Sequence, residues 1–300
     1  MVNYMIMEKK MKNSFKSYTY SGTMSFALII QSLKLDINDE IIVPVTLCQS
    51  IIDVIVKKRL KPIFVDIDDN FIINKSIIDK NITKKTKVIL FVEQYGNIIV
   101  DNNDYYNLNG ERIVKVLDSC QNGIKKYKNN NYDYVFYSFN HRKPIDLNGY
   151  SMIISNNKIE TNIRMPLKKR IVFNYKKILY KLNLCKKIYI KNVISKKIII
   201  PGHIVQCKNY SYHRIIYVAD ISKMVFLKLE DSIYDYMQKN NYDVVQTTIE
   251  IAPYEKLNVK KRFPNYERLK YQTLFFRSNN RIKEYNNIIK YLNEIYKELL

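Results

Sequence analysis

The chain has 300 residues, of which 47% are hydrophobic and 26% charged, the composition of a folded globular protein with a sizeable core. It contains no apolar run of about 18 residues and no signal-type N-terminus, so we expect a soluble cytoplasmic protein without a membrane span. The net charge of +22 is spread along the whole chain and accompanies frequent Ile, Asn and Tyr. This bias is typical of AT-rich coding sequences, so the charge alone does not favour nucleic-acid binding.

The first half of the chain alternates between strand and helix patterns. Residues 18–20 predict a strand and residues 24–33 a helix. Further strands are predicted at 40–45, 62–68, 87–96, 113–120, 132–139 and 151–156, and further helices at 49–58, 76–81 and 101–107. This alternation predicts an α/β fold with three αβα layers, in which a mostly parallel sheet lies between two layers of helices. Together with part of a connecting helix at 166–190, it forms a predicted large domain over residues 1–185.

The second half of the chain has a different pattern of predicted strands and helices. Short strands are predicted at 203–207, 212–219 and 244–251, and helices at 225–240 and 281–300. In the first of these helices, one apolar face is formed by Phe226, Leu229, Ile233 and Met237. We therefore predict a smaller α+β domain over residues 186–300.

The cysteines give no sign of a disulfide framework or a metal site. Cys48, Cys120, Cys185 and Cys207 are widely separated, with no CxxC pair and no His at metal-ligand spacing. We read them as reduced thiols and predict no metal.

A small-residue turn precedes the first predicted helix. Ser21, Gly22 and Thr23 stand between a strand and a helix N-terminus, where free N–H groups and the positive end of the helix dipole can hold an anion. An ordinary helix N-cap has the same sequence pattern. The turn therefore indicates a phosphate site only if other residues support it.

Residues 134–150, YVFYSFNHRKPIDLNGY, present one lysine at the end of a strand. Pro144 disfavours a helical conformation at Lys143, so this lysine is expected in a turn or extended segment. Most such lysines are solvated loop cations. However, sites in α/β sheets lie outside the carboxyl ends of the strands, where Asp118 is also expected.

Several segments occur in the order and spacing of one known family. They are SGT (21–23), EIIVP (40–44), KPIFVDID (61–68), VEQYGN (92–97), LDSCQ (117–121) and YSFNHRK (137–143), with KKRFPNYERLKYQTLFF (260–276) near the end. Together they resemble the DegT/DnrJ/EryC1/StrS sugar aminotransferases. The resemblance implies a pyridoxal phosphate (PLP) enzyme with the aspartate-aminotransferase fold, also called fold type I, and a large domain that binds the cofactor.

The resemblance also implies roles for individual residues. Lys143 would bind the cofactor covalently and then act as the general acid and base. Asp118 would pair with the pyridine nitrogen and Gln121 with the ring hydroxyl. The phosphate would be held by Gly22, Thr23, the backbone of Met24, and Ser138.

The chain departs from the family pattern in several places. Cys48 stands where an aromatic residue usually stacks on the cofactor ring. The segment before Ser21 and the loops after Lys143 are shorter than usual, which suggests a divergent, shortened member. TNIRM (161–165) resembles a segment whose Asn, here Asn162, reaches the cofactor of a neighbouring subunit.

From this resemblance we expect an enzyme that transfers an amino group from an amino-acid donor, glutamate in the family, to a keto-deoxysugar nucleotide, as in polysaccharide biosynthesis. A homodimer with sites at the interface is also implied. Two alternatives stay open. Related sugar dehydratases have His in place of the lysine, and His141 stands near Lys143. The first alternative is therefore a sugar dehydratase, and the second is a catalytically inactive relative that only binds a ligand.

Overall fold

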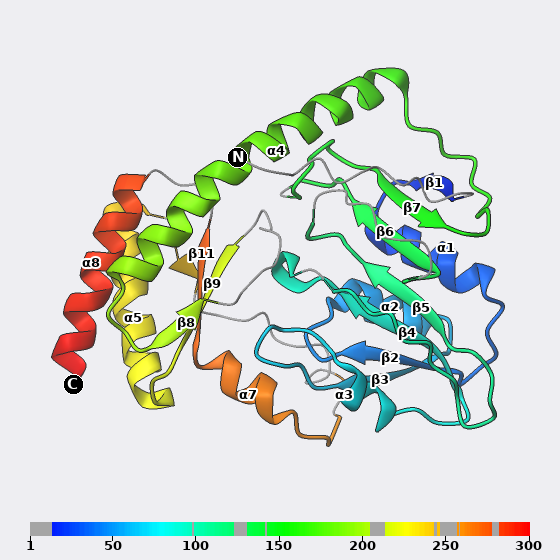
Figure 1. Cartoon of the computed structure of the whole chain (residues 1–300), viewed down its shortest axis with the longest axis horizontal. Coiled ribbons are helices and arrows are strands. Elements are labelled where there is room, and N and C mark those ends of the chain that lie inside the picture. Colours follow the sequence, from blue (N-terminus) through cyan, green and yellow to red (C-terminus); the bar gives the residue numbers. More distant parts are fainter. Residues whose placement is uncertain are drawn as a thin grey trace.

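The computed structural model describes residues 14–97, 99–122, 131–141, 143–204, 214–242, 245–246, 257, 259–277 and 282–300. Two sheets organise this part of the chain (Figure 1). The larger sheet contains β1 (Phe15–Thr19), β2 (Glu40–Pro44), β3 (Lys61–Val65), β4 (Thr86–Val92), β5 (Val114–Asp118), β6 (Tyr134–Ser138) and β7 (Ser151–Ser155). Their spatial order is β1-β7-β6-β5-β4-β2-β3.

The larger sheet is mixed but mostly parallel. β3, β2, β4, β5 and β6 run parallel to one another, whereas β7 pairs antiparallel with both β6 and β1. β2 and β6 are buried along their whole length, as expected for strands covered on both faces. The predicted α/β class with a mostly parallel sheet is confirmed.

The first helices follow the predicted alternation. They are α1 (Gly22–Ser32), α2 (Gln49–Lys57) and the short α3 (Lys75–Asp79). α1 begins after Ser21, whose side-chain oxygen accepts a hydrogen bond from the Met24 N–H at 3.1 Å. It packs against β6 and β7. The start of α1 therefore lies beside the strand that leads to Lys143.

The helix predicted at 101–107 is wrong. Asn103 N–H donates to Asp101 Oδ1 at 2.9 Å, a local side-chain bond that competes with helix formation. The buried Lys115 ammonium also binds the carbonyl oxygens of Asp101 (3.3 Å) and Asn103 (2.5 Å). These carbonyls therefore accept hydrogen bonds from a side chain on the sheet, and residues 101–105 form no regular secondary structure.

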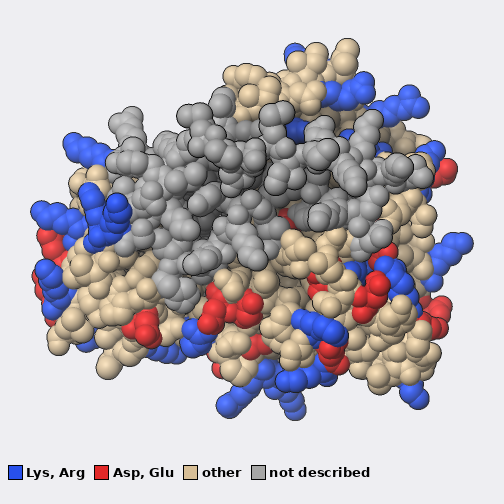
Figure 2. Space-filling view, in the orientation of Figure 1, with Lys and Arg blue, Asp and Glu red and all other residues tan. Residues whose placement is uncertain are grey.

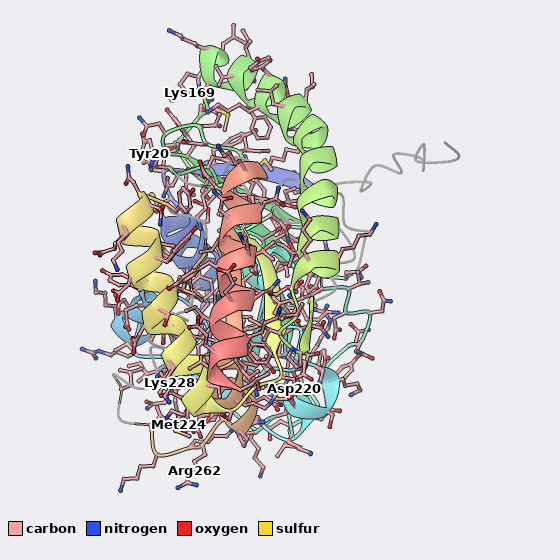
Figure 3. All side chains as sticks on the ribbon, turned by 90° about the vertical axis from the view of Figure 1, so that its left-hand side faces the viewer. Tyr20, Lys169, Asp220, Met224, Lys228 and Arg262 are labelled. Atoms are coloured by element: carbon pink, nitrogen blue, oxygen red, sulfur yellow. The ribbon has the colours of Figure 1, made fainter. Side chains whose placement is uncertain are left out.

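The second half of the chain forms a four-stranded sheet covered by helices. Its elements are α4 (Leu167–Lys197), β8 (Gly202–Ile204), β9 (Arg214–Ala219), α5 (Lys223–Asn240), β10 (Val245–Gln246), α7 (Pro264–Lys270), β11 (Thr273–Arg277) and α8 (Ile282–Leu299). The sheet order is β10-β11-β9-β8, and α8 lies between α4 and α5 and contacts both (Figure 3). The sequence missed α7 and β11.

The apolar face predicted on α5 lies in this second core. Phe226, Leu229 and Ile233 are buried and Met237 packs partly against them. The predicted domain boundary after residue 185 falls within α4, which continues unbroken from Leu167 to Lys197. That boundary stays a prediction.

Charged side chains are distributed over the visible surface. Lys and Arg lie around the rim of the face shown in Figure 2, with Asp and Glu between them. Among the described helices, none combines the length and the apolar character needed to cross a membrane.

One carboxylate joins the two halves of the chain. Asp66, just after β3, accepts hydrogen bonds from the backbone N–H groups of Asn265 (2.9 Å) and Tyr266 (3.0 Å) at the start of α7. Arg268 on the same helix pairs with Asp69. Two segments about 200 residues apart, KPIFVDID and FPNYER, are thus in direct contact.

We expect Asp66→Ala to lower the free energy of unfolding by about 1–2 kcal/mol, because it removes the acceptor for two helix-start N–H groups. Asp69→Ala is the matched control. It removes only an exposed ion pair with Arg268 and should cost less than about 1 kcal/mol. Urea unfolding measures both, and equal losses in the two variants would contradict the capping role.

Candidate functional site

The strand register brings the ends of β4, β5 and β6 to one edge of the sheet. Val92 is the register partner of Asp118, and Asp118 is the partner of Phe136. Ser119 N–H continues the ladder by donating to the Phe136 carbonyl at 2.9 Å. The loops that leave these strands are therefore neighbours.

Asp118 is buried at this edge. Its Oδ1 accepts a hydrogen bond from Cys120 N–H at 2.9 Å. Burial raises the pKa of the Asp118 carboxyl, while its contacts with Cys120 and the positive charge of Lys143 act in the opposite direction. Asp118 is thus a desolvated carboxylate within electrostatic range of the predicted lysine.

Lys143 lies in the turn that follows β6. Its N–H donates to the Asn140 carbonyl at 3.1 Å, and the side chain is half-buried. The positive charge of the Lys143 ammonium acts on Cys48, Asp118 and Cys120, where it offsets part of the rise in pKa that burial causes. All three groups are therefore near Lys143. Lys143 and Asp118 therefore lie within electrostatic range of each other, and their roles stay predictions.

His141 does not share this position. Its side chain is 76% exposed and its Nδ1 lies 3.3 Å from Asp146 Oδ2. The described contacts of His141 are with the loop, so it is a poorer candidate than Lys143 for chemistry beside Asp118.

The Ser-Gly-Thr turn meets the end of β6. A Cβ atom built on Gly22 would lie 2.9 Å from Cys120 Sγ and 3.4 Å from Ser138 Cβ. Real Cβ atoms essentially never lie this close to a sulfur atom. Any larger residue at position 22 would therefore force the turn or the Cys120 side chain to move. Gly22 and Ser138, both predicted to hold a phosphate, are therefore in contact.

Thr23 and Met24 are the other predicted phosphate residues. Thr23 Oγ1 donates to Ser50 Oγ at 3.2 Å, and Ser50 Oγ lies 3.4 Å from Cys48 Sγ. Met24 N–H is already capped by Ser21, so a phosphate would have to share this donor. Ser50 was missed, although a Ser in the first turn of α2 is a signal for it.

Buried hydroxyl groups anchor α1 to the sheet. Ser25 Oγ lies 2.9 Å from Thr19 Oγ1 and 2.7 Å from Ser151 Oγ, and Ser151 Oγ donates to the Tyr137 carbonyl. All three hydroxyl residues are fully buried. Sequence reasoning missed this group of hydroxyls because Ser151 lies 126 residues from Ser25.

Gln121 and the segment after β4 hold each other. Tyr95 N–H donates to Gln121 Oε1 at 2.8 Å. Glu93, fully buried, accepts hydrogen bonds from Ser119 Oγ (2.6 Å) and Asn122 Nδ2 (2.5 Å). The Gln121 Oε1 atom is therefore engaged. Its Nε2 group donates to Gln94 Oε1 at 3.4 Å and has a second hydrogen that could face a ligand.

Cys48 and Asn162 represent the main departures from the family pattern. Cys48 is the N-cap residue of α2 and is exposed. Desolvation by neighbouring protein atoms and the negative charge of Asp118 raise the pKa of its thiol. Asn162 is exposed on the surface beside β1, to which the preceding Thr161 is bound. Among the described residues, no group of three His, Cys, Asp or Glu side chains could hold a metal ion.

Comparison with known families identifies the chain. Residues 8–169, more than half of its length, match the DegT/DnrJ/EryC1/StrS aminotransferase family. The chain belongs to this family. The segments that suggested the resemblance lie mostly within the matched range.

Two relatives and one solved structure illustrate the similarity. GDP-perosamine synthase of Escherichia coli O157:H7 is 30% identical over 144 residues, which is 46% of this chain and 39% of that protein. UDP-4-amino-4-deoxy-L-arabinose–oxoglutarate aminotransferase of Shewanella sediminis (strain HAW-EB3) is 29% identical over 105 residues, 35% of this chain and 27% of that protein. The match thus spans less than half the length of either relative.

The solved structure covers far more of the chain. Spr1654 of Streptococcus pneumoniae, which is assigned as a sugar aminotransferase, matches in its PLP form with a TM-score of 0.76 and 18% identity. The match covers 95% of this chain and 88% of that one. At this identity the similarity shows the fold, not the activity.

The reactivity of Cys48 should report the charges around it. Asp118→Asn removes a charge that raises the pKa of Cys48, so its alkylation by iodoacetamide should begin at lower pH than in the unchanged protein. Lys143→Ala removes a charge that lowers this pKa, so alkylation should require higher pH. Mass spectrometry of the peptide that contains Cys48, over a pH series, measures both. Identical midpoints in all three proteins would contradict the arrangement.

Proposed function

We propose that the chain is a PLP-dependent aminotransferase that moves an amino group from glutamate to a keto-deoxysugar nucleotide. The observation that carries the proposal is the meeting of Lys143, the buried Asp118 and the Ser-Gly-Thr turn at one edge of the parallel sheet. Family membership supports the reaction class. The name of the Shewanella relative, which includes oxoglutarate, supports glutamate as the donor.

The residues present fit this cofactor. Gly22 has no Cβ, so the start of α1 packs directly against Cys120 and Ser138. N–H groups and the helix dipole at this helix start favour a phosphate, and the hydroxyls of Thr23 and Ser138 would add hydrogen bonds to it. Asp118 is a buried carboxylate whose pKa is raised by burial, and a cationic ring nitrogen would supply the partner that compensates its desolvation. Gln121 Nε2 is the donor for a ring hydroxyl.

The proposed mechanism assigns proton movement to Lys143. When bound, pyridoxal phosphate supplies a ring that accepts electrons from the substrate carbon that loses its proton. Lys143 Nζ takes that proton as a general base and returns it as a general acid. Asp118 would hold the ring nitrogen in its protonated form, and the Gly22 turn would orient the phosphate end. The donor leaves as a 2-oxo acid, and the ketosugar leaves as an amino sugar in the second half reaction.

A homodimer is part of the proposal. The exposed position of Asn162 leaves its amide free to approach a second copy of the chain. A dehydratase is the alternative within this fold, and it would need a residue other than Lys143 as the base. The exposed His141, paired with Asp146, offers less support for that alternative.

Cofactor binding provides the first test. Protein incubated with PLP and reduced with sodium borohydride should retain the cofactor covalently, and mass spectrometry should locate it on Lys143. Lys143→Ala should abolish this attachment, whereas Lys158→Ala, which changes a lysine exposed on the surface, should not. Protein that never takes up PLP would overturn the proposal and favour a non-catalytic relative.

Product analysis provides the second test. Cofactor-loaded protein mixed with glutamate and a nucleotide-linked 4-keto-6-deoxysugar should form 2-oxoglutarate and an amino sugar in equal amounts. A single turnover with glutamate alone should already release 2-oxoglutarate, because the first half reaction needs no sugar. A deoxygenated sugar with release of ammonia would identify the dehydratase instead.

A further inference from the structure

We propose that Cys120 is a positioning residue of this site, an inference that rests on the proposed function. Its thiol lies between Gly22, at the phosphate end, and Asp118, at the ring-nitrogen end. The thiol thereby sets the separation between the two groups that hold opposite ends of the cofactor.

The steric contact is the first part of the argument. A Cβ on Gly22 would lie 2.9 Å from Cys120 Sγ, 3.4 Å from Ser138 Cβ and 3.9 Å from Phe136 Cε2. The sulfur is the nearest of these atoms, so it is the surface on which the turn rests. Removing it would leave space into which the turn could move.

The polar contacts are the second part. Cys120 N–H donates to Asp118 Oδ1 at 2.9 Å, and the thiol interacts with the same carboxyl group. Burial and the charge of Asp118 raise the pKa of the thiol, so it stays protonated at neutral pH and can donate its hydrogen. Cys120 therefore contacts the carboxylate through a backbone hydrogen bond and through the interaction of its thiol.

The backbone around Cys120 is fixed. Ser119 N–H is bound to the Phe136 carbonyl at 2.9 Å, and Ser119 Oγ donates to the buried Glu93 at 2.6 Å. Cys120 follows directly, so its sulfur cannot retreat from the turn without breaking these bonds.

The turn is fixed from the other side. Ser25, one helical turn after Gly22, is held between Thr19 (2.9 Å) and Ser151 (2.7 Å) in the interior. Because both sides are anchored, the sulfur acts as a spacer of fixed width between them. An ordinary core cysteine would fill space without linking two parts of a site.

The steric test is a pair of substitutions. Gly22→Ala should weaken PLP binding by about tenfold to a hundredfold, since the new methyl group overpacks against the sulfur. Adding Cys120→Ala should restore most of the affinity, although Cys120→Ala alone weakens it. Cys48→Ala is the matched control: it removes another nearby thiol that does not contact Gly22, and it should not rescue Gly22→Ala. Dissociation constants for PLP and melting temperatures of the ligand-free variants are measured together.

The polar test uses the dependence of PLP affinity on pH. Cofactor binding requires an ionised Asp118, so affinity falls as pH drops through its pKa. Loss of the thiol donor in Cys120→Ala raises that pKa, so affinity should fall at a higher pH than in the unchanged protein. Cys120→Ser keeps a donor and should retain the original profile. A role limited to packing would move the melting temperature without moving this profile.

The outcomes separate the two claims. If the unchanged protein binds no PLP, both the proposed function and this inference fail. If it binds PLP but the Gly22 and Cys120 substitutions add independently and the pH profiles coincide, only the inference is overturned. Should Gly22→Ala fail to fold, the comparison of Ala and Ser at Cys120 decides alone.

Discussion

The parallel register of β4, β5 and β6 is the constraint on which the candidate site depends. Because Val92, Asp118 and Phe136 are successive register partners, the chain leaves all three strands at one edge. A shift of one residue in β5 would turn Asp118 to the other face of the sheet. The site is therefore specified first by strand pairing, and only then by the residues in the loops.

Strand pairing alone leaves the loops free, and buried polar groups restrict them. Glu93 is fully buried and accepts hydrogen bonds from Ser119 and Asn122. A typical intramolecular hydrogen bond adds only about 0.5–1.5 kcal/mol net to stability. The effect of Glu93 is geometric: it fixes Ser119 and Asn122, and with them the segment that carries Asp118 and Gln121.

Much of this arrangement can be predicted from the sequence, and the failures have physical causes. Short apolar runs between turn residues located the strands, since burial in a parallel sheet dictates composition. The segment 101–107 looked helical because local pattern does not reveal that Asp101 and Asn103 bind elsewhere. Likewise, the α7 start depends on Asp66, about 200 residues earlier, and no local pattern encodes such a partner.

The same contrast between local patterns and distant contacts applies to the site. Lys143, Asp118, Gln121, Ser138 and the Gly22 turn were found because each belongs to a contiguous motif at a strand end. Ser50, Glu93 and the Ser25–Ser151 pair were missed because their importance arises only from distant contacts. The roles of the first group remain proposals, whereas their proximity is a property of the structure.

Cys48 alters how such a site would hold its ligand. Aromatic pairs contribute about 0.5–1.5 kcal/mol beyond the area they bury, and a thiol cannot supply that contribution. The Cys48 sulfur, 3.4 Å from Ser50 Oγ, instead belongs to a polar group that also includes Thr23. With less contact on the ring face, affinity must come mainly from the two ends, the phosphate turn and Asp118. The distance between those ends then matters more than in a stacked site, which is why a rigid spacer such as Cys120 would be useful in this chain.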